Sequence, residues 1–163
     1  MRLYLMRHGI AVDREDPDCP PDAERPLTPD GAKRTRDAAQ GLKWLDIAPD
    51  WVLTSPYVRA KQTAGIVLDV LRSAHLRPTP TDALLPEADP SLLRKALKSE
   101  AGASVLAVGH LPHLDLAIAH LLDAPHGVTE LKKAGVVCLE LPADGPGTIL
   151  LALPPKLLRR LGG

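Results

Sequence analysis

The stretch that decides the fold opens the chain: Leu3-Tyr4-Leu5-Met6 is followed at once by Arg7-His8-Gly9. Four apolar residues without polar alternation indicate a strand covered on both faces, as in a parallel sheet flanked by helices. Buried charges cost free energy unless they are paired, and open α/β sheets bind ligands at the carboxyl ends of their strands. We therefore expect Arg7-His8-Gly9 to form the floor of a site, with Gly9 leaving room for a ligand beside the backbone.

Helix and strand signals alternate along the rest of the chain. Thr28-Pro29 is a helix start, with a Thr N-cap and Pro at the first helical position, and Asp89-Pro90 repeats this signal. The expected helices cover about 29–45, 56–72, 90–100 and 112–122, and the expected strands cover 3–6, 51–53, 105–108, 136–141 and 148–153. Residues 156–163 form a short basic helix or a loose end. This order predicts an α/β fold, a three-layer α/β/α sandwich around a mostly parallel sheet.

Length and composition narrow the class of protein. A chain of 163 residues suits one domain over residues 1–163. The 20 basic and 20 acidic residues give zero formal net charge, so nucleic-acid binding lacks its usual electrostatic basis. No run approaches the roughly 18 apolar residues of a membrane helix, and Cys19 and Cys138 form no disulfide framework. We expect a soluble, cytoplasmic protein, whose oligomeric state the sequence leaves open.

Three apolar runs end in residues capable of chemistry. These residues are Arg7 and His8 after the first run, Ser55 and Arg59 after the second, and His110 after the run at 105–108. If the three strands are parallel, their ends meet at one edge of the sheet. Arginine presents a donor fork suited to phosphate, and helix starts near Pro56 and Pro112 add N–H donors for an anion. We predict a phosphoryl-binding site made of Arg7, His8, Arg59 and His110.

Several motifs resemble the histidine phosphatase superfamily and occur in its order. They are Arg7-His8-Gly9, then Ser55-Pro56-x-x-Arg59-Ala60-x-Gln62-Thr63, then Gly109-His110. The tripeptide alone is a weak signal, but the second motif is long. Arg25-Pro26-Leu27-Thr28-x-x-Gly31, Leu85-Pro86-Glu87 and the compact length resemble in particular the SixA-type phosphohistidine phosphatases. The resemblance runs from about Met1 to Leu153 and implies a phosphoglycerate mutase-like fold.

The resemblance also implies a mechanism. The histidine of the tripeptide, here His8, would be the nucleophile and form a covalent phosphohistidine that water then hydrolyses. Arg7, Arg59 and a protonated His110 would hold the phosphoryl oxygens and stabilise their charge. The arginines supply the positive charge, so no metal or other cofactor is implied.

The leaving group separates two substrate classes. Glu87 is a candidate proton donor, although an exposed turn carboxylate is an equally good interpretation, because Ala88-Asp89-Pro90 departs from the pattern of the larger phosphatases. A protonated imidazole leaves readily, and the short chain has little room for inserts that cap the site. The favoured substrate is therefore phosphohistidine on a protein, for example a phosphotransfer domain. A small phosphate ester, such as a sugar or nucleotide phosphate, is the alternative; a phosphate-binding module without catalysis and a structural adaptor are weaker ones.

Two further features remain open. The segment 10–27 is long for a connection and is either a lid or binding segment, or an acidic solvated loop; its acidic residues are Asp13, Glu15, Asp16, Asp18, Asp22 and Glu24. His113 and His120 follow His110 at helical spacings, which makes a zinc site conceivable. The chain has no HExxH motif and no convincing carboxylate partner there, so we predict no metal.

Overall fold

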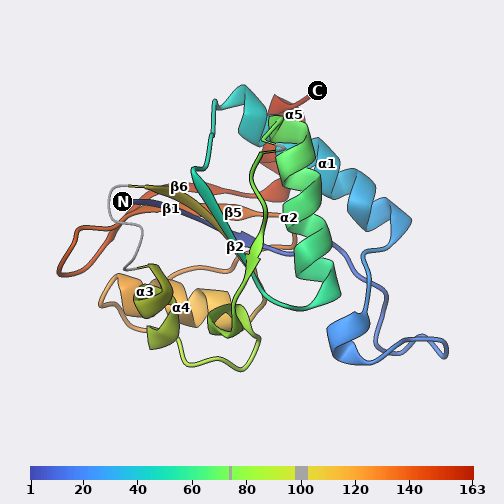
Figure 1. Ribbon diagram of the computed structural model, residues 1–163, viewed down its shortest axis with the longest axis horizontal. Coiled ribbons are helices and arrows are strands. Elements are labelled where there is room, and N and C mark those ends of the chain that lie inside the picture. Colours follow the sequence, from blue (N-terminus) through green and yellow to red (C-terminus); the bar gives the residue numbers. More distant parts are fainter. Residues whose placement is uncertain (74, 98–102) are drawn as a thin grey trace.

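The computed structural model describes residues 1–73, 75–97 and 103–163. Six strands form one sheet in the order β3-β2-β4-β1-β5-β6 (Figure 1). The strands are β1 (Arg2–Arg7), β2 (Trp51–Thr54), β3 (Thr79–Pro80), β4 (Ser104–Gly109), β5 (Val136–Glu140) and β6 (Thr148–Leu153). Strands β1 to β4 run parallel, and β5 is antiparallel to both of its neighbours, β1 and β6. The sheet is mostly parallel, as predicted. The short strand β3 was missed, because two exposed residues carry no hydrophobic pattern.

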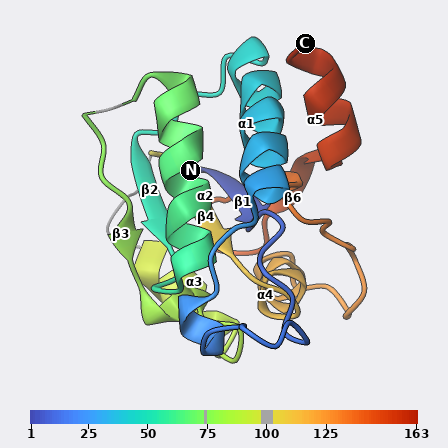
Figure 2. The ribbon, with the colours of Figure 1, turned by 90° about the vertical axis from the view of Figure 1, so that its right-hand side faces the viewer.

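Helices cover both faces of this sheet. They are α1 (Pro29–Trp44), α2 (Val58–Leu71), α3 (Ser91–Leu97), α4 (His113–Leu121) and α5 (Pro155–Leu161). Figure 1 and Figure 2 show α1, α2 and α5 on one face and α3 and α4 on the other, and a separate apolar core fills each interface. This confirms the three-layer sandwich.

The C-terminal residues form the helix α5 rather than a loose end, whereas the expected end of the third helix near residue 100 lies outside the described residues. None of the described helices is both long and apolar enough to span a membrane.

Helix α1 is held against the turn that follows β1. The Thr28 side chain caps the helix by accepting a hydrogen bond from the Gly31 N–H at 2.9 Å. A Cβ at Gly31 would lie 2.0 Å from the Ile10 carbonyl oxygen, and a Cβ at Gly9 would lie 2.2 Å from Thr35 Oγ1. Both glycines are therefore needed for close packing of α1. The structure thus gives a packing reason for Gly9, where the sequence predicted room for a ligand.

The strand ends meet as predicted. Strands β2, β4 and β1 are neighbours and parallel, with Arg7 paired to Gly109 and Thr54 to Val108. The residues just beyond them are joined by backbone hydrogen bonds, from the His8 N–H to Gly109 O at 3.0 Å and from the Ser55 N–H to Val108 O at 2.9 Å. The same edge of the sheet therefore carries three chemically capable chain segments.

Candidate active site

His8 is buried at the end of β1 with one ring nitrogen fixed and the other turned toward Arg59. Its Nδ1 lies 2.6 Å from the Gly9 carbonyl oxygen. A carbonyl oxygen only accepts, so Nδ1 carries the proton and Nε2 keeps its lone pair. Burial, together with the charges of Arg59, Arg7 and Lys133, lowers the pKa of His8 to about 3, although the Gly9 hydrogen bond opposes this. At neutral pH, His8 is a neutral imidazole with Nε2 available as a nucleophile.

Arg59, in the first turn of α2, has all three of its guanidinium nitrogens engaged. Its Nε donates to His8 Nε2 at 3.3 Å, Nη1 donates to the Asp22 carbonyl oxygen at 2.5 Å, and Nη2 donates to Asp22 Oδ2 at 3.1 Å. The guanidinium carbon also lies 5.0 Å from the centroid of the Tyr57 ring, a cation–π distance. The side chain is 2% exposed. Arg59 is therefore a rigidly held cation whose Nε points at the nucleophilic nitrogen.

His110 completes a buried triplet with His8 and Arg59. Its ring centroid is 5.0 Å from that of His8, and its Nε2 lies 2.8 Å from Ser55 Oγ. Its Nδ1 is buried and has no hydrogen-bond partner among the described residues. Burial, then the charges of His8 and Arg59, lowers the pKa of His110 to about 2. A phosphoryl dianion between the two rings would act in the opposite direction and raise this pKa, so the protonated His110 of the anion-bound state stays a prediction.

Arg7 lies beside this triplet rather than within it. Its Nη1 donates to the Leu131 carbonyl oxygen at 3.1 Å, and its buried Nε has no partner among the described residues. Burial lowers the pKa of Arg7, and the charge of Asp115 partly opposes this. The positive charge of Arg7 acts on His8, whose pKa it helps to lower. The structure thus brings three of the four predicted residues into direct contact and places the fourth within electrostatic reach.

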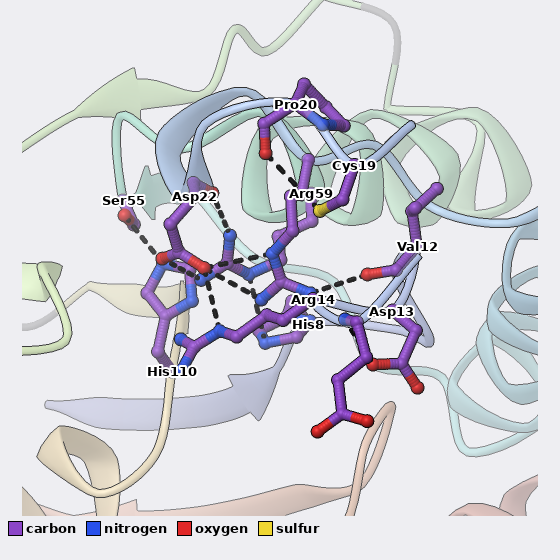
Figure 3. Close-up of polar contacts among 12 residues, drawn as sticks. His8, Val12, Asp13, Arg14, Cys19, Pro20, Asp22, Ser55, Arg59 and His110 are labelled. Atoms are coloured by element: carbon purple, nitrogen blue, oxygen red, sulfur yellow. Dashed lines mark hydrogen bonds and ion pairs between the residues drawn. The ribbon is translucent and has the colours of Figure 1, made fainter. Parts of the chain in front are cut away.

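Asp22 is the site residue that sequence reasoning missed. Figure 3 shows its carboxylate among the arginine side chains: Oδ1 accepts from Arg25 Nε at 2.9 Å and from Arg14 Nε at 3.1 Å, while Oδ2 accepts from Arg59. Partial burial acts to raise the pKa of Asp22, but Arg59, Arg25 and Arg14 outweigh it and lower the pKa below its ordinary value. Asp22 therefore anchors the acidic segment to the site and orients the Arg59 fork.

The other candidate residues stand apart from the triplet. Glu87 is exposed in the turn before α3, where its charge acts on His113, and its role as a proton donor stays a prediction. His113 is buried at the start of α4 with neither ring nitrogen bonded to a described residue, while His120 is exposed. Nowhere in residues 1–73, 75–97 and 103–163 do three His, Cys, Asp or Glu side chains lie close enough to hold a metal ion.

Comparison with known proteins places this geometry in a family. Residues 3–89 match the model of the histidine phosphatase superfamily, branch 1. Phosphohistidine phosphatase SixA of Escherichia coli strain K12 is 33% identical over 169 residues, which cover 98% of this chain and 97% of that protein. A solved structure of the protein histidine phosphatase SixA complexed with tungstate superposes with a TM-score of 0.84 at 31% identity, covering 97% of this chain and 99% of that one.

These matches show that the chain belongs to the histidine phosphatase superfamily. Phosphoglycerate mutase of Bacillus anthracis shares the fold, with a TM-score of 0.73 at 19% identity over 98% of this chain and 96% of that one. The expected phosphoglycerate mutase-like fold and SixA-type resemblance are thereby confirmed. The chain is a phosphatase of this superfamily, as its three motifs predicted.

The buried imidazoles of His8 and His110 make folding stability dependent on pH, and His113, whose pKa burial also lowers, acts in the same direction. The folded pKa values of His8 and His110, about 3 and about 2, lie below the ordinary value of 6.5. Below pH 6.5 these two histidines therefore become protonated in the unfolded chain but stay neutral in the folded protein. The free energy of unfolding decreases as the pH falls. We expect the free energy of unfolding to fall between pH 6.5 and 4.5 by on the order of 1 kcal/mol per pH unit for each histidine.

Urea denaturation at pH values of about 7.0, 6.0, 5.0 and 4.5 measures the slope of the unfolding free energy against pH. These pH values span the range in which unfolded histidines titrate. His8→Gln should reduce the slope, and the matched control His120→Gln, at an exposed position, should retain it. An unfolding free energy that does not change over this interval, or an equal slope in His8→Gln, would contradict the expectation.

Proposed function

We propose that this phosphatase hydrolyses phosphohistidine on a protein through a covalent intermediate on His8. The observation that carries the proposal is the His8 ring, which holds its proton at Nδ1 and turns Nε2 to the Arg59 Nε at 3.3 Å, with the His110 ring 5.0 Å away. A relative of known activity, SixA of Escherichia coli, is a phosphohistidine phosphatase. A related structure holds tungstate, a tetrahedral oxyanion like phosphate.

The proposed reaction has two displacements at phosphorus. His8 Nε2 attacks the phosphorus atom, the bond to the substrate imidazole breaks, and the departing ring keeps the bonding electron pair and carries a proton. The Nδ1–H bond to the Gly9 carbonyl stabilises the positive charge that develops on the His8 ring. Water then attacks the phosphorylated His8, which releases inorganic phosphate and restores the neutral ring.

Cations around His8 stabilise the phosphoryl charge in both steps. Arg59 Nε already points to His8 Nε2, where the phosphoryl group must lie. His110 can donate from Nε2, now 2.8 Å from Ser55 Oγ, once the anion has raised its pKa. Arg7 adds a positive charge that acts on His8. The low pKa of His8 serves the same chemistry, because a protonated ring has no lone pair for attack.

Substrate preference tests the proposal. The rate of phosphate release is measured with two peptides of identical sequence, one carrying phosphohistidine and the other phosphoserine, and with glucose 6-phosphate and AMP. A protonated phosphohistidine releases a neutral imidazole, which leaves far more readily than an alkoxide without strong acid catalysis, a contribution of about 10²-fold or more. We expect kcat/KM to be higher for the phosphohistidine peptide by that factor. Faster turnover of either small ester would instead assign the chain to small-molecule phosphatases.

A further inference from the structure

A basic groove opens beside Arg7, on the sheet edge that carries the proposed site. It has a volume of about 440 Å³ and lies between the end of β1, the first turns of α1, the segment 132–134 and α5. Figure 2 shows α1 and α5 side by side. The described residues that line the groove include six cationic side chains and no carboxylate; the cations are Arg7, Arg34, Lys132, Lys133, Lys156 and Arg159. We call this surface the basic groove.

Among the described residues, only two of these six cations form ion pairs, and Arg7 donates to a backbone carbonyl instead. Arg34 pairs with Asp30 at 2.7 Å, and Lys132 pairs with Glu130. Among the described residues, no ion pair or side-chain hydrogen bond engages Lys133, Lys156 or Arg159. The chain as a whole has zero formal net charge, so this excess of positive charge is local. Such a concentration of one sign on a concave surface attracts an anionic partner at low ionic strength.

The basic groove is joined to the proposed site. Arg7 lines the groove and acts electrostatically on His8, and the charge of Lys133 reaches His8 as well. The Ala134 N–H donates to the carbonyl oxygens of Arg7 at 3.0 Å and His8 at 3.3 Å, which fixes the segment 132–134 to the end of β1. When the phosphohistidine of a protein substrate reaches His8, the substrate residues next to it would therefore lie along the groove.

We propose that the basic groove binds the carboxylates of an acidic segment that flanks the phosphohistidine in a protein substrate. This inference rests on the proposed function, since it concerns the substrate of the same site. A single small anion would engage only one part of the groove. Cations contributed by two helices and a loop suit several carboxylates spaced along one chain. The groove would thus select protein substrates by the charge next to the modified histidine.

Two synthetic phosphohistidine peptides test this inference, one flanked by glutamates and the other by serines. At low salt the wild type should turn over the acidic peptide with a kcat/KM about tenfold higher, as expected for two or three screened ion pairs. The preference should shrink in 0.5 M NaCl, where the screening length is only about 4 Å. An equal kcat/KM for the two peptides at low salt would overturn the inference.

A pair of charge-matched variants locates the effect. Lys156→Glu with Arg159→Glu reverses two charges of the groove, and Arg36→Glu with Arg160→Glu reverses two exposed charges outside its lining. The first variant should lose the preference for the acidic peptide, and the second should keep it. An equal loss in both would also overturn the inference.

The serine peptide tests the proposed function separately from the groove. A wild type that hydrolyses neither peptide refutes the proposed function, whereas a wild type that hydrolyses both peptides equally refutes only the role of the groove.

Discussion

His8→Ala is expected to lower the turnover of a phosphohistidine peptide by about 10⁴-fold or more, the scale seen when a covalent nucleophile is removed. Alanine has no lone pair to offer the phosphorus atom, and the remaining cations can only bind the anion. The Gly9 carbonyl would lose its ring donor, but the strand-end hydrogen bond from residue 8 N–H to Gly109 O is made by the backbone and remains. The variant should therefore fold and still bind phosphate.

Single-turnover kinetics and phosphate binding by calorimetry measure the two halves of this expectation. The matched control is His120→Ala, which removes an exposed imidazole and should retain wild-type turnover. A His8→Ala protein that folds and still hydrolyses the peptide within tenfold of the wild-type rate would contradict the role of His8, since tenfold amounts to only about 1.4 kcal/mol.

Arg59→Ala is expected to reduce kcat/KM by about 10³-fold, the upper range for loss of one donor to a developing anion. Arg59 Nε donates to His8 Nε2 at 3.3 Å, so its loss removes stabilisation where the phosphoryl group is transferred. Asp22 would keep Arg25 and Arg14 as partners, which limits structural damage. Arg59→Lys should recover only a small part of the activity. The single ammonium of lysine cannot donate at once to His8, to the Asp22 carbonyl oxygen and to Asp22 Oδ2, as the planar guanidinium does.

Steady-state kinetics on the phosphohistidine peptide, with thermal unfolding to check the fold, test this second expectation. Lys61→Ala is the control, because Lys61 is an exposed cation two residues further along the same helix. Activity of folded Arg59→Ala equal to that of Lys61→Ala would contradict the assigned role. Full activity of Arg59→Lys would show that charge alone, and not the fork, is required.

The main architecture was readable because burial leaves a local signature. The run Leu3–Met6 and the run at 105–108 are apolar without alternation, and both became central strands covered on two faces. The Thr28-Pro29 signal marked the start of α1 correctly, since the capping hydrogen bond is made within four residues. Parallel order then implied that His8 and His110 share one sheet edge, and the rings are in contact.

What escaped prediction depends on contacts between distant parts of the chain. Asp22 lies 37 positions before its partner Arg59, within a segment whose six acidic residues look alike in sequence. The basic groove is likewise assembled from the start of α1, the segment 132–134 and α5; the sequence marks the C-terminal residues as basic, but no local pattern joins the three segments. Arg7 donates from Nη1 to the Leu131 carbonyl, a partner that no local pattern indicates, and its role in holding the phosphoryl group stays a prediction.

The most direct test of the central claim is to trap the phosphorylated enzyme. The wild type is mixed with a peptide carrying radiolabelled phosphohistidine and quenched in alkali within the first turnover, and the label is located by peptide mapping. The account predicts transient label on His8, stable in alkali and released by acid, and none in His8→Ala. Phosphate release at the wild-type rate with the label absent from His8, or present on another residue, would contradict it.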